Sequence, residues 1–185
     1  PDGERGELTT GDVAKALAYM DAFCRDYQHY KEGAWCYEDG CIYRGLVLLH
    51  RATGEARWLD HLLRLTGPQI AADGTLARYA PGEFNIDNIL AGRSLFHLAM
   101  TTGDGRYMKA AAAQAGQLEH HPRIATGNYW HKRTYPDQVW LDGLYMGLPC
   151  NLSASLVTFL LLARPVLGVL AGEAWSLPTP WPLVA

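Results

Sequence analysis

Residues 128–147 combine side chains that can bind a sugar and move a proton on it. An aromatic ring such as that of Trp140 can stack on the apolar face of a sugar ring. His131 and Lys132 can contact a carboxylate, and Asp142 can donate or accept a proton. This set of residue types suits an acidic sugar.

Asp142 has a counterpart earlier in the chain, at Asp87. The segment DGLYMG that starts at Asp142 resembles the segment DNILAG that starts at Asp87, and each aspartate is expected to open a helix. An aspartate at such a place is most often a helix N-cap. Because the two aspartates occupy equivalent places in two repeats, both carboxylates would instead point into the same pocket. Two carboxylates in one apolar pocket raise the pKa of one of them, as a general acid requires.

The neighbouring residues have structural alternatives as well. His131 could be a hydrogen-bonded core histidine, although the adjacent Lys132 favours contact with a ligand. Trp35, Trp130 and Trp140 also suit a core, and for Trp130 we prefer that interpretation. The pair His120 and His121 lacks metal-ligand spacing and is expected in a solvated connector, so no metal site is predicted.

Helical hairpins are predicted to position these residues. Apolar residues recur at helical spacing from about Thr10, with Thr9 or Thr10 as N-cap, and no strand pattern competes. The segment TGEARWL at Thr53 returns 49 residues later as TGDGRYM at Thr102, which indicates repeated hairpins. Charged and aromatic residues gather at the starts of alternate helices, which favours a closed toroid over an open solenoid. The expected helices span 10–27, 43–51, 58–70, 87–101, 106–118 and 140–146.

Composition excludes several other classes. Lys and Arg number 16 against 19 Asp and Glu, without a basic run, so no nucleic-acid partner is expected. The four cysteines show no CxxC spacing and are predicted to be free, mostly buried thiols. Because the sequence opens on Pro1 without a basic-then-apolar leader, we interpret it as processed, trimmed or partial. A cytoplasmic location is expected, with a periplasmic or secreted one as the alternative.

These motifs together resemble glycoside hydrolase family 105, the unsaturated rhamnogalacturonyl hydrolases, and the related family 88 unsaturated glucuronyl hydrolases. The similarity covers about residues 35–149. It rests on WCYEDG from Trp35, the turns at Thr53 and Thr102, NIDNI from Asn85, HPR from His121, WHK from Trp130 and WLDGLYMG from Trp140.

The resemblance implies an all-α fold, an (α/α)6 barrel of inner and outer helices that binds the sugar at the inner-helix mouth. Its general acid and base falls on Asp142 and its second essential aspartate on Asp87. The substrate would be an oligosaccharide that ends in a 4,5-unsaturated uronate, cleaved by hydration of the double bond without metal or cofactor. The residues expected to line the pocket are His131, Lys132, Trp140, Met146, Trp35 and Tyr37.

The chain is short for such a ring. Six hairpins of about 50 residues need roughly 300 residues, so the 185 residues form an incomplete barrel, about half present. We predict that residues 1–149 are the N-terminal half of the toroid, and that residues 150–185 are a divergent apolar tail caused by truncation or a frame-shift. Arg164 and Pro165 interrupt its apolar run, so no membrane span is expected.

Other functions remain open at this stage. The open half-barrel predicts self-association as a possible partner interaction, and the chain could be an inactive fragment. The alternative function is a noncatalytic helical repeat that binds carbohydrate or protein, which would keep the aromatic residues without needing the aspartates. An epimerase or lyase of the same fold ranks last, because it would need a histidine-centred pair in place of Asp142.

Overall fold

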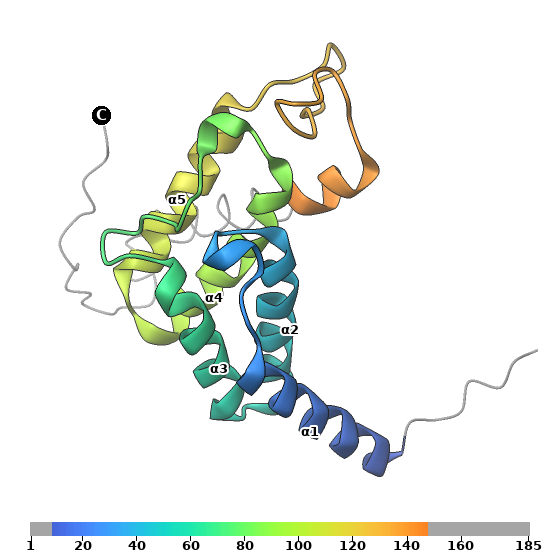
Figure 1. The fold of residues 1–185 in the computed structure, drawn as a ribbon, viewed down its shortest axis with the longest axis vertical. Coiled ribbons are helices and arrows are strands. Elements are labelled where there is room, and N and C mark those ends of the chain that lie inside the picture. Colours follow the sequence, from blue (N-terminus) through green and yellow to red (C-terminus); the bar gives the residue numbers. More distant parts are fainter. Residues whose placement is uncertain (1–8, 148–185) are drawn as a thin grey trace, which may run out of the picture.

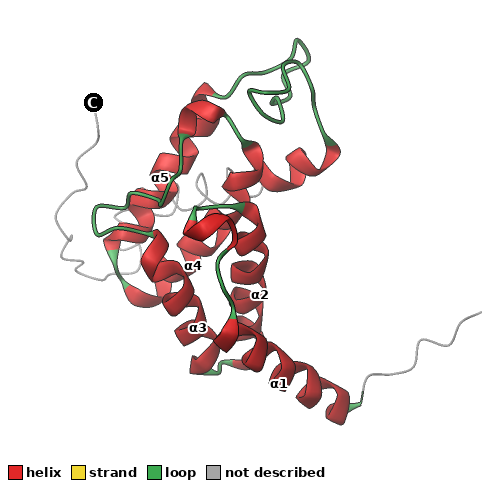
Figure 2. Ribbon diagram, viewed as in Figure 1, coloured by secondary structure: helices red, strands yellow, loops and turns green. Residues whose placement is uncertain are grey.

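The computed structural model describes residues 9–147, and this part of the chain is helical (Figures 1 and 2). Its β structure is limited to two isolated bridges, Ile70 with Leu76 and Arg123 with Tyr129. The predicted all-α class is therefore confirmed. Among the described residues, no helix is long and apolar enough to cross a membrane. The predicted tail at 150–185 lies outside the described residues.

Helix α1 (Thr10–Asp26) begins after Thr9, one of the two expected N-cap residues, which forms a capping box with Asp12. The Thr9 side chain accepts a hydrogen bond from the Asp12 amide, and the Asp12 side chain accepts one from the Thr9 amide. Cys24 is buried, whereas Tyr19 (68% exposed) and Phe23 (37% exposed) face outward. These two rings line a groove of about 510 Å³ with Tyr27 and Tyr30. One face of α1 is thus open in the described part of the chain.

Two helical hairpins follow, α2 (Tyr37–Thr53) with α3 (Ala56–Thr66), and α4 (Arg93–Thr102) with α5 (Gly105–His120). Their turns share one chemistry. Thr53 and Thr102 each donate from the hydroxyl to a carbonyl four residues back and accept from the amide two residues on. The following Gly54 and Gly103 have φ of 69° and 72°, which favours glycine. This shared turn explains the 49-residue repeat.

The hairpins meet along α2 and the short 3₁₀ helix η4 (Ile86–Gly92), which precedes α4. Gly40 makes the contact possible, because a Cβ at this position would lie 2.7 Å from the Ala91 Cα. Large rings fill the core between the helices, with Trp35, Tyr43 and Trp58 fully buried. The close approach of α2 therefore fixes the position of η4.

The observed boundaries correct several expectations. Helix α2 begins at Tyr37, six residues before the expected start, and the helix expected at 87–101 is divided between η4 and α4. Three further 3₁₀ turns join the elements: η1 (Tyr30–Gly33), η2 (Gly67–Gln69) and η3 (Pro81–Glu83). After α5 the chain runs through an irregular loop, gold in Figure 1, and residues 141–147, in orange, are helical again. Cys24, Cys36 and Cys41 are free, and Cys41 is exposed.

Candidate active site

Asp87 lies at the start of η4 with its side chain buried (7% exposed). It is not the N-cap, because the Asn85 side chain accepts the hydrogen bond from the Asp87 amide at 3.1 Å. The Asp87 Oδ2 atom lies 2.7 Å from Lys132 Nζ and 3.5 Å from His131 Nε2. The other oxygen, Oδ1, is buried without a hydrogen-bond partner among the described residues. One carboxylate oxygen is thus paired, and the other is left with unused acceptor capacity.

His131 and Lys132 reach Asp87 from the irregular loop that follows α5. Two backbone bonds fix this part of the loop: the His131 amide donates to the Gln138 carbonyl at 2.7 Å, and the Ile86 amide donates to the His131 carbonyl at 3.1 Å. The second bond joins the loop directly to the residue before Asp87. The two segments that carry the ion pair are therefore in contact through their backbones.

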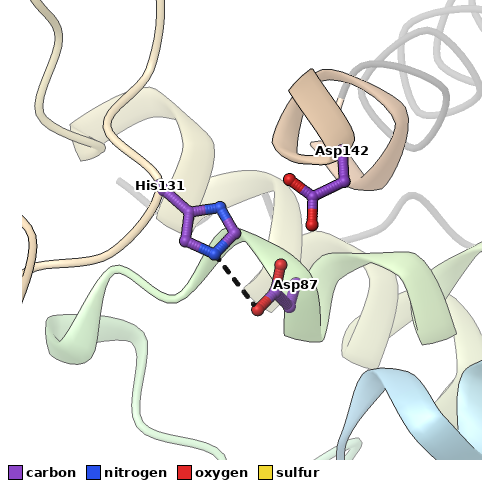
Figure 3. A group of neighbouring side chains, drawn as sticks. All are labelled: Asp87, His131 and Asp142. Atoms are coloured by element: carbon purple, nitrogen blue, oxygen red, sulfur yellow. Dashed lines mark ion pairs between the residues drawn. The ribbon is translucent and has the colours of Figure 1, made fainter. Parts of the chain in front are cut away.

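Asp142 approaches from the helical segment 141–147, and its carboxylate points toward Asp87 and His131 (Figure 3). Two glycines let this helix come close. A Cβ at Gly143 would lie 3.2 Å from His131 Nδ1, and a Cβ at Gly147 would lie 2.7 Å from Ile86 Cδ1. Asp142 is solvent-exposed, and its Oδ1 accepts a hydrogen bond from the Gly143 amide at 3.0 Å. The structure thus pairs an accessible carboxylate with a buried one.

Stacked rings stand beside the carboxylates. The His131 and Trp140 rings are nearly parallel, 10° apart with centroids 4.0 Å apart, and Tyr135 stacks on Trp140 at 5.2 Å. Trp140 remains 40% exposed and donates from Nε1 to Gln138 Oε1. An exposed indole next to a carboxylate can bind a sugar face. Tyr135 was not among the predicted site residues, although its place in the aromatic-rich motif was a usable signal.

Of the two basic side chains beside Asp87, only Lys132 is charged. Burial lowers the pKa of His131 below its ordinary value; the Asp87 carboxylate opposes this shift, and the Lys132 ammonium adds to it. His131 is therefore neutral at pH 7. The positive charge that balances Asp87 comes from Lys132.

A cation is a second occupant to consider for this cluster. Donor atoms of Asp87, His131 and Asp142 lie within 4.8 Å of one another, and carboxylates with an imidazole can hold a divalent metal. Lys132, however, already places a positive charge 2.7 Å from Asp87 Oδ2. We therefore assign no metal to these residues.

The remaining predicted residues lie around this cluster at different depths. Met146 is half-buried, one helical turn after Asp142. Trp35 is 1% exposed and donates from Nε1 to the Asn88 carbonyl, so it supports η4 from the core. Tyr37 begins α2, with Lys31 Nζ 5.4 Å from its ring centroid. Trp130 is half-buried with its Nε1 atom enclosed.

The expectation that His120 and His121 lie in a solvated connector is half wrong, because His120 ends α5 and His121 is its C-cap. His120 is exposed, but His121 is buried between the rings of Phe84 and Tyr129, with centroid distances of 5.5 and 5.3 Å. Phe84 comes from a distant segment and Tyr129 from a later part of the same loop, and the helical spacing of the sequence gave no sign of either contact.

Comparison with known proteins agrees with this geometry. The family model for Glycosyl Hydrolase Family 88 matches residues 15–158, which include both aspartates. The chain belongs to glycosyl hydrolase family 88. This family 88 chain is also similar to a solved glycoside hydrolase from family 105 of C. acetobutylicum ATCC 824, with 33% identity and a TM-score of 0.62. The resemblance predicted from the sequence is confirmed.

Comparison with the solved family 105 structure also shows how much of that protein this chain covers. The match covers 73% of this chain but 36% of the solved chain, so the family 88 chain spans much less than the whole length of that protein. Its hairpins are part of an (α/α)6-type helical fold. Both matched families are families of glycoside hydrolases.

Proposed function

We propose that this chain carries the proton-transfer residues of a glycoside hydrolase that removes 4,5-unsaturated uronic acid from the non-reducing end of rhamnogalacturonan oligosaccharides. The observation that carries the proposal is the pairing of an exposed Asp142 with a buried Asp87 already balanced by Lys132. A proton donor must reach the substrate, whereas a group that stabilises charge is most effective away from water. The two carboxylates meet these different demands.

The proposed reaction is hydration of the C4=C5 double bond. Asp142 gives its proton to C4, and the positive charge that develops at C5 and the ring oxygen is stabilised by the Asp87 carboxylate. Water adds to C5 and returns a proton to Asp142, leaving a hemiketal. The ring then opens to a ketone at C5, and the resulting hemiacetal at C1 collapses to an aldehyde and releases the aglycone with its own hydroxyl.

Substrate contacts follow from the same geometry. Trp140 presents a partly exposed indole beside Asp142, stacked on His131, and is assigned to a sugar face. Lys132 keeps a partly exposed ammonium that can approach the uronate carboxylate while it pairs with Asp87. Met146 adds an apolar contact one turn below Asp142. Trp35 and Tyr37 are left outside this set, because the first is buried in the core and the second packs under Lys31.

The test uses the intact native polypeptide that carries this chain and an unsaturated uronyl-rhamnose disaccharide. Turnover should remove the ultraviolet absorbance of the conjugated double bond, and in heavy water the product should carry deuterium at C4. Asp142→Asn should lower kcat by about 10²–10⁴-fold, the usual contribution of general acid catalysis. Asp137→Asn, which alters an exposed carboxylate of the same loop, serves as the control. A product without deuterium at C4, or near-normal turnover by Asp142→Asn, would exclude this mechanism.

Binding without turnover is the second candidate, because the chain spans 36% of the solved family 105 relative. It would keep the Trp140 stack and make no use of Asp142 as an acid. In that case the disaccharide would quench Trp140 fluorescence in the wild type and in Asp142→Asn to the same extent, with no loss of absorbance in either.

A further inference from the structure

The residues that form the candidate site come from two segments far apart in the sequence, η4 and the loop after α5. The C-terminal end of α5 contacts both segments. Asp87 belongs to η4, whereas His131 and Lys132 belong to a loop without helix or strand. We propose that Gln117 on α5 and His121 at its C-cap, which lie one turn apart, are positioning residues that fix the position of these two segments relative to each other. This inference rests on the proposed function, because it assigns a role relative to Asp87 and His131.

The hydrogen bonds form a continuous path. The Tyr79 hydroxyl donates to Gln117 Oε1. Gln117 Nε2 then donates to the Asn85 carbonyl at 3.2 Å and lies 3.4 Å from His121 Nδ1. His121 Nε2 lies 2.8 Å from the Trp130 carbonyl.

The donors and acceptors along the path have one consistent assignment. The Trp130 carbonyl can only accept, so His121 Nε2 carries the proton and Nδ1 is free to accept from the Gln117 amide group. His121 is therefore neutral. Burial lowers its pKa, and the nearby positive charge of Arg123 acts in the same direction. Every polar atom of the Gln117 and His121 side chains is thus used.

The anchor points adjoin the candidate site. The Asn85 side chain caps the Asp87 amide, and Trp130 immediately precedes His131. The bond from the Ile86 amide to the His131 carbonyl closes the circuit between the two segments. The loop has little regular structure of its own, so its distance from η4 depends on such external bonds. Loss of the Gln117 bridge should therefore change the environment of His131.

The matched experiment compares Gln117→Met with Gln69→Met in the full 185-residue chain. Gln69 is equally buried, accepts from the Tyr43 hydroxyl and donates to backbone carbonyls, but it lies in another network, around Asp39. Amide hydrogen exchange at Ile86 and His131 should become about 3–10-fold faster in Gln117→Met, as expected for the loss of one or two hydrogen bonds. Gln69→Met should leave the exchange rates of these two amides unchanged, even where it lowers global stability.

A second comparison uses the histidine. His121→Gln keeps a donor that can reach the Trp130 carbonyl, whereas His121→Leu removes it, so the former should restore most of the amide protection lost in the latter. His97→Gln, at a buried histidine that bonds His50 on α2, is the control.

The ring of His131 gives the readout that general destabilisation would not move. Its NMR-monitored pKa should rise toward the ordinary value in Gln117→Met and His121→Leu, and stay unchanged in Gln69→Met and His97→Gln. Equal effects in all four variants, or an unmoved His131 in the first two, would overturn the proposal. These measurements need no turnover, so an inactive wild-type enzyme would refute the reaction above and leave the positioning role to be judged separately.

Discussion

Replacement of Lys132 by methionine removes the charge that balances a buried carboxylate. Lys132 Nζ lies 2.7 Å from Asp87 Oδ2, and the Asp87 side chain is 7% exposed. Methionine has a similar length and apolar stem, so packing changes little. The variant therefore isolates the electrostatic contribution of the ion pair.

The magnitude follows from the distance and the burial. Two unit charges 2.7 Å apart attract with about 6 kcal/mol at an effective dielectric constant of about 20. Most of this offsets the cost of removing Asp87 from water, and breaking a buried pair usually costs about 3–5 kcal/mol. Because the Lys132 side chain is 28% exposed, water screens part of the interaction. We expect Lys132→Met to lower the free energy of unfolding by about 2–3 kcal/mol.

Chemical denaturation of four proteins measures this coupling: wild type, Lys132→Met, Asp87→Asn and the double variant. The double variant should be more stable than Lys132→Met, because asparagine leaves no unbalanced charge, and the coupling energy should be about 2 kcal/mol. The pKa of His131 should also rise in Lys132→Met, because the repulsion from the ammonium is lost. A coupling energy near zero would refute the argument that Lys132 balances Asp87.

Three further predictions concern the scaffold. Gly40→Ala should destabilise the fold by about 1–3 kcal/mol, because the added Cβ would clash with the backbone of η4. Gly45→Ala in the same helix meets open space and should be neutral or stabilising, and thermal melts compare the two variants. Folding lowers the pKa of His121, so the contribution of His121 to stability is complete above about pH 6.5 and is lost as the pH falls below that value. In denaturation curves, His121→Gln should make the free energy of unfolding depend less on pH. We predict that the chain self-associates through the exposed rings of Tyr19 and Phe23, so that their joint replacement by lysine lowers the mass measured by analytical ultracentrifugation.

The sequence predicted the hairpins because their signals are local. The Thr-Gly-acid turns at Thr53 and Thr102 depend on hydrogen bonds within five residues, and the capping box at Thr9 spans four. The start of α2 and the 3₁₀ form of η4 were not predicted. These two elements meet where Gly40 packs against Ala91, a contact between the two hairpins. Local patterns carry no record of such a contact.

The candidate site, like the fold, was predicted only in part. The motif residues Asp87, His131, Trp140 and Asp142 do come together, as repeat equivalence and the density of functional groups predicted. Their individual environments could not be predicted. Asp87 is buried where His131 and Lys132 from the later loop lie against it, whereas Asp142 is exposed. His121 is buried between Phe84 from a distant segment and Tyr129 from its own loop.

The unequal burial of the two aspartates also bears on how the site could evolve. Asp87 is held by Lys132, by the cap from Asn85 and by the backbone bond at Ile86, so its loss would disturb several segments at once. The Asp142 side chain has one hydrogen bond among the described residues, to the next amide in its own helix. A noncatalytic descendant could therefore lose Asp142 at little cost in stability while keeping Asp87 for structural reasons. The proposed reaction requires both carboxylates, and this chain carries both, the exposed one beside an aromatic stack.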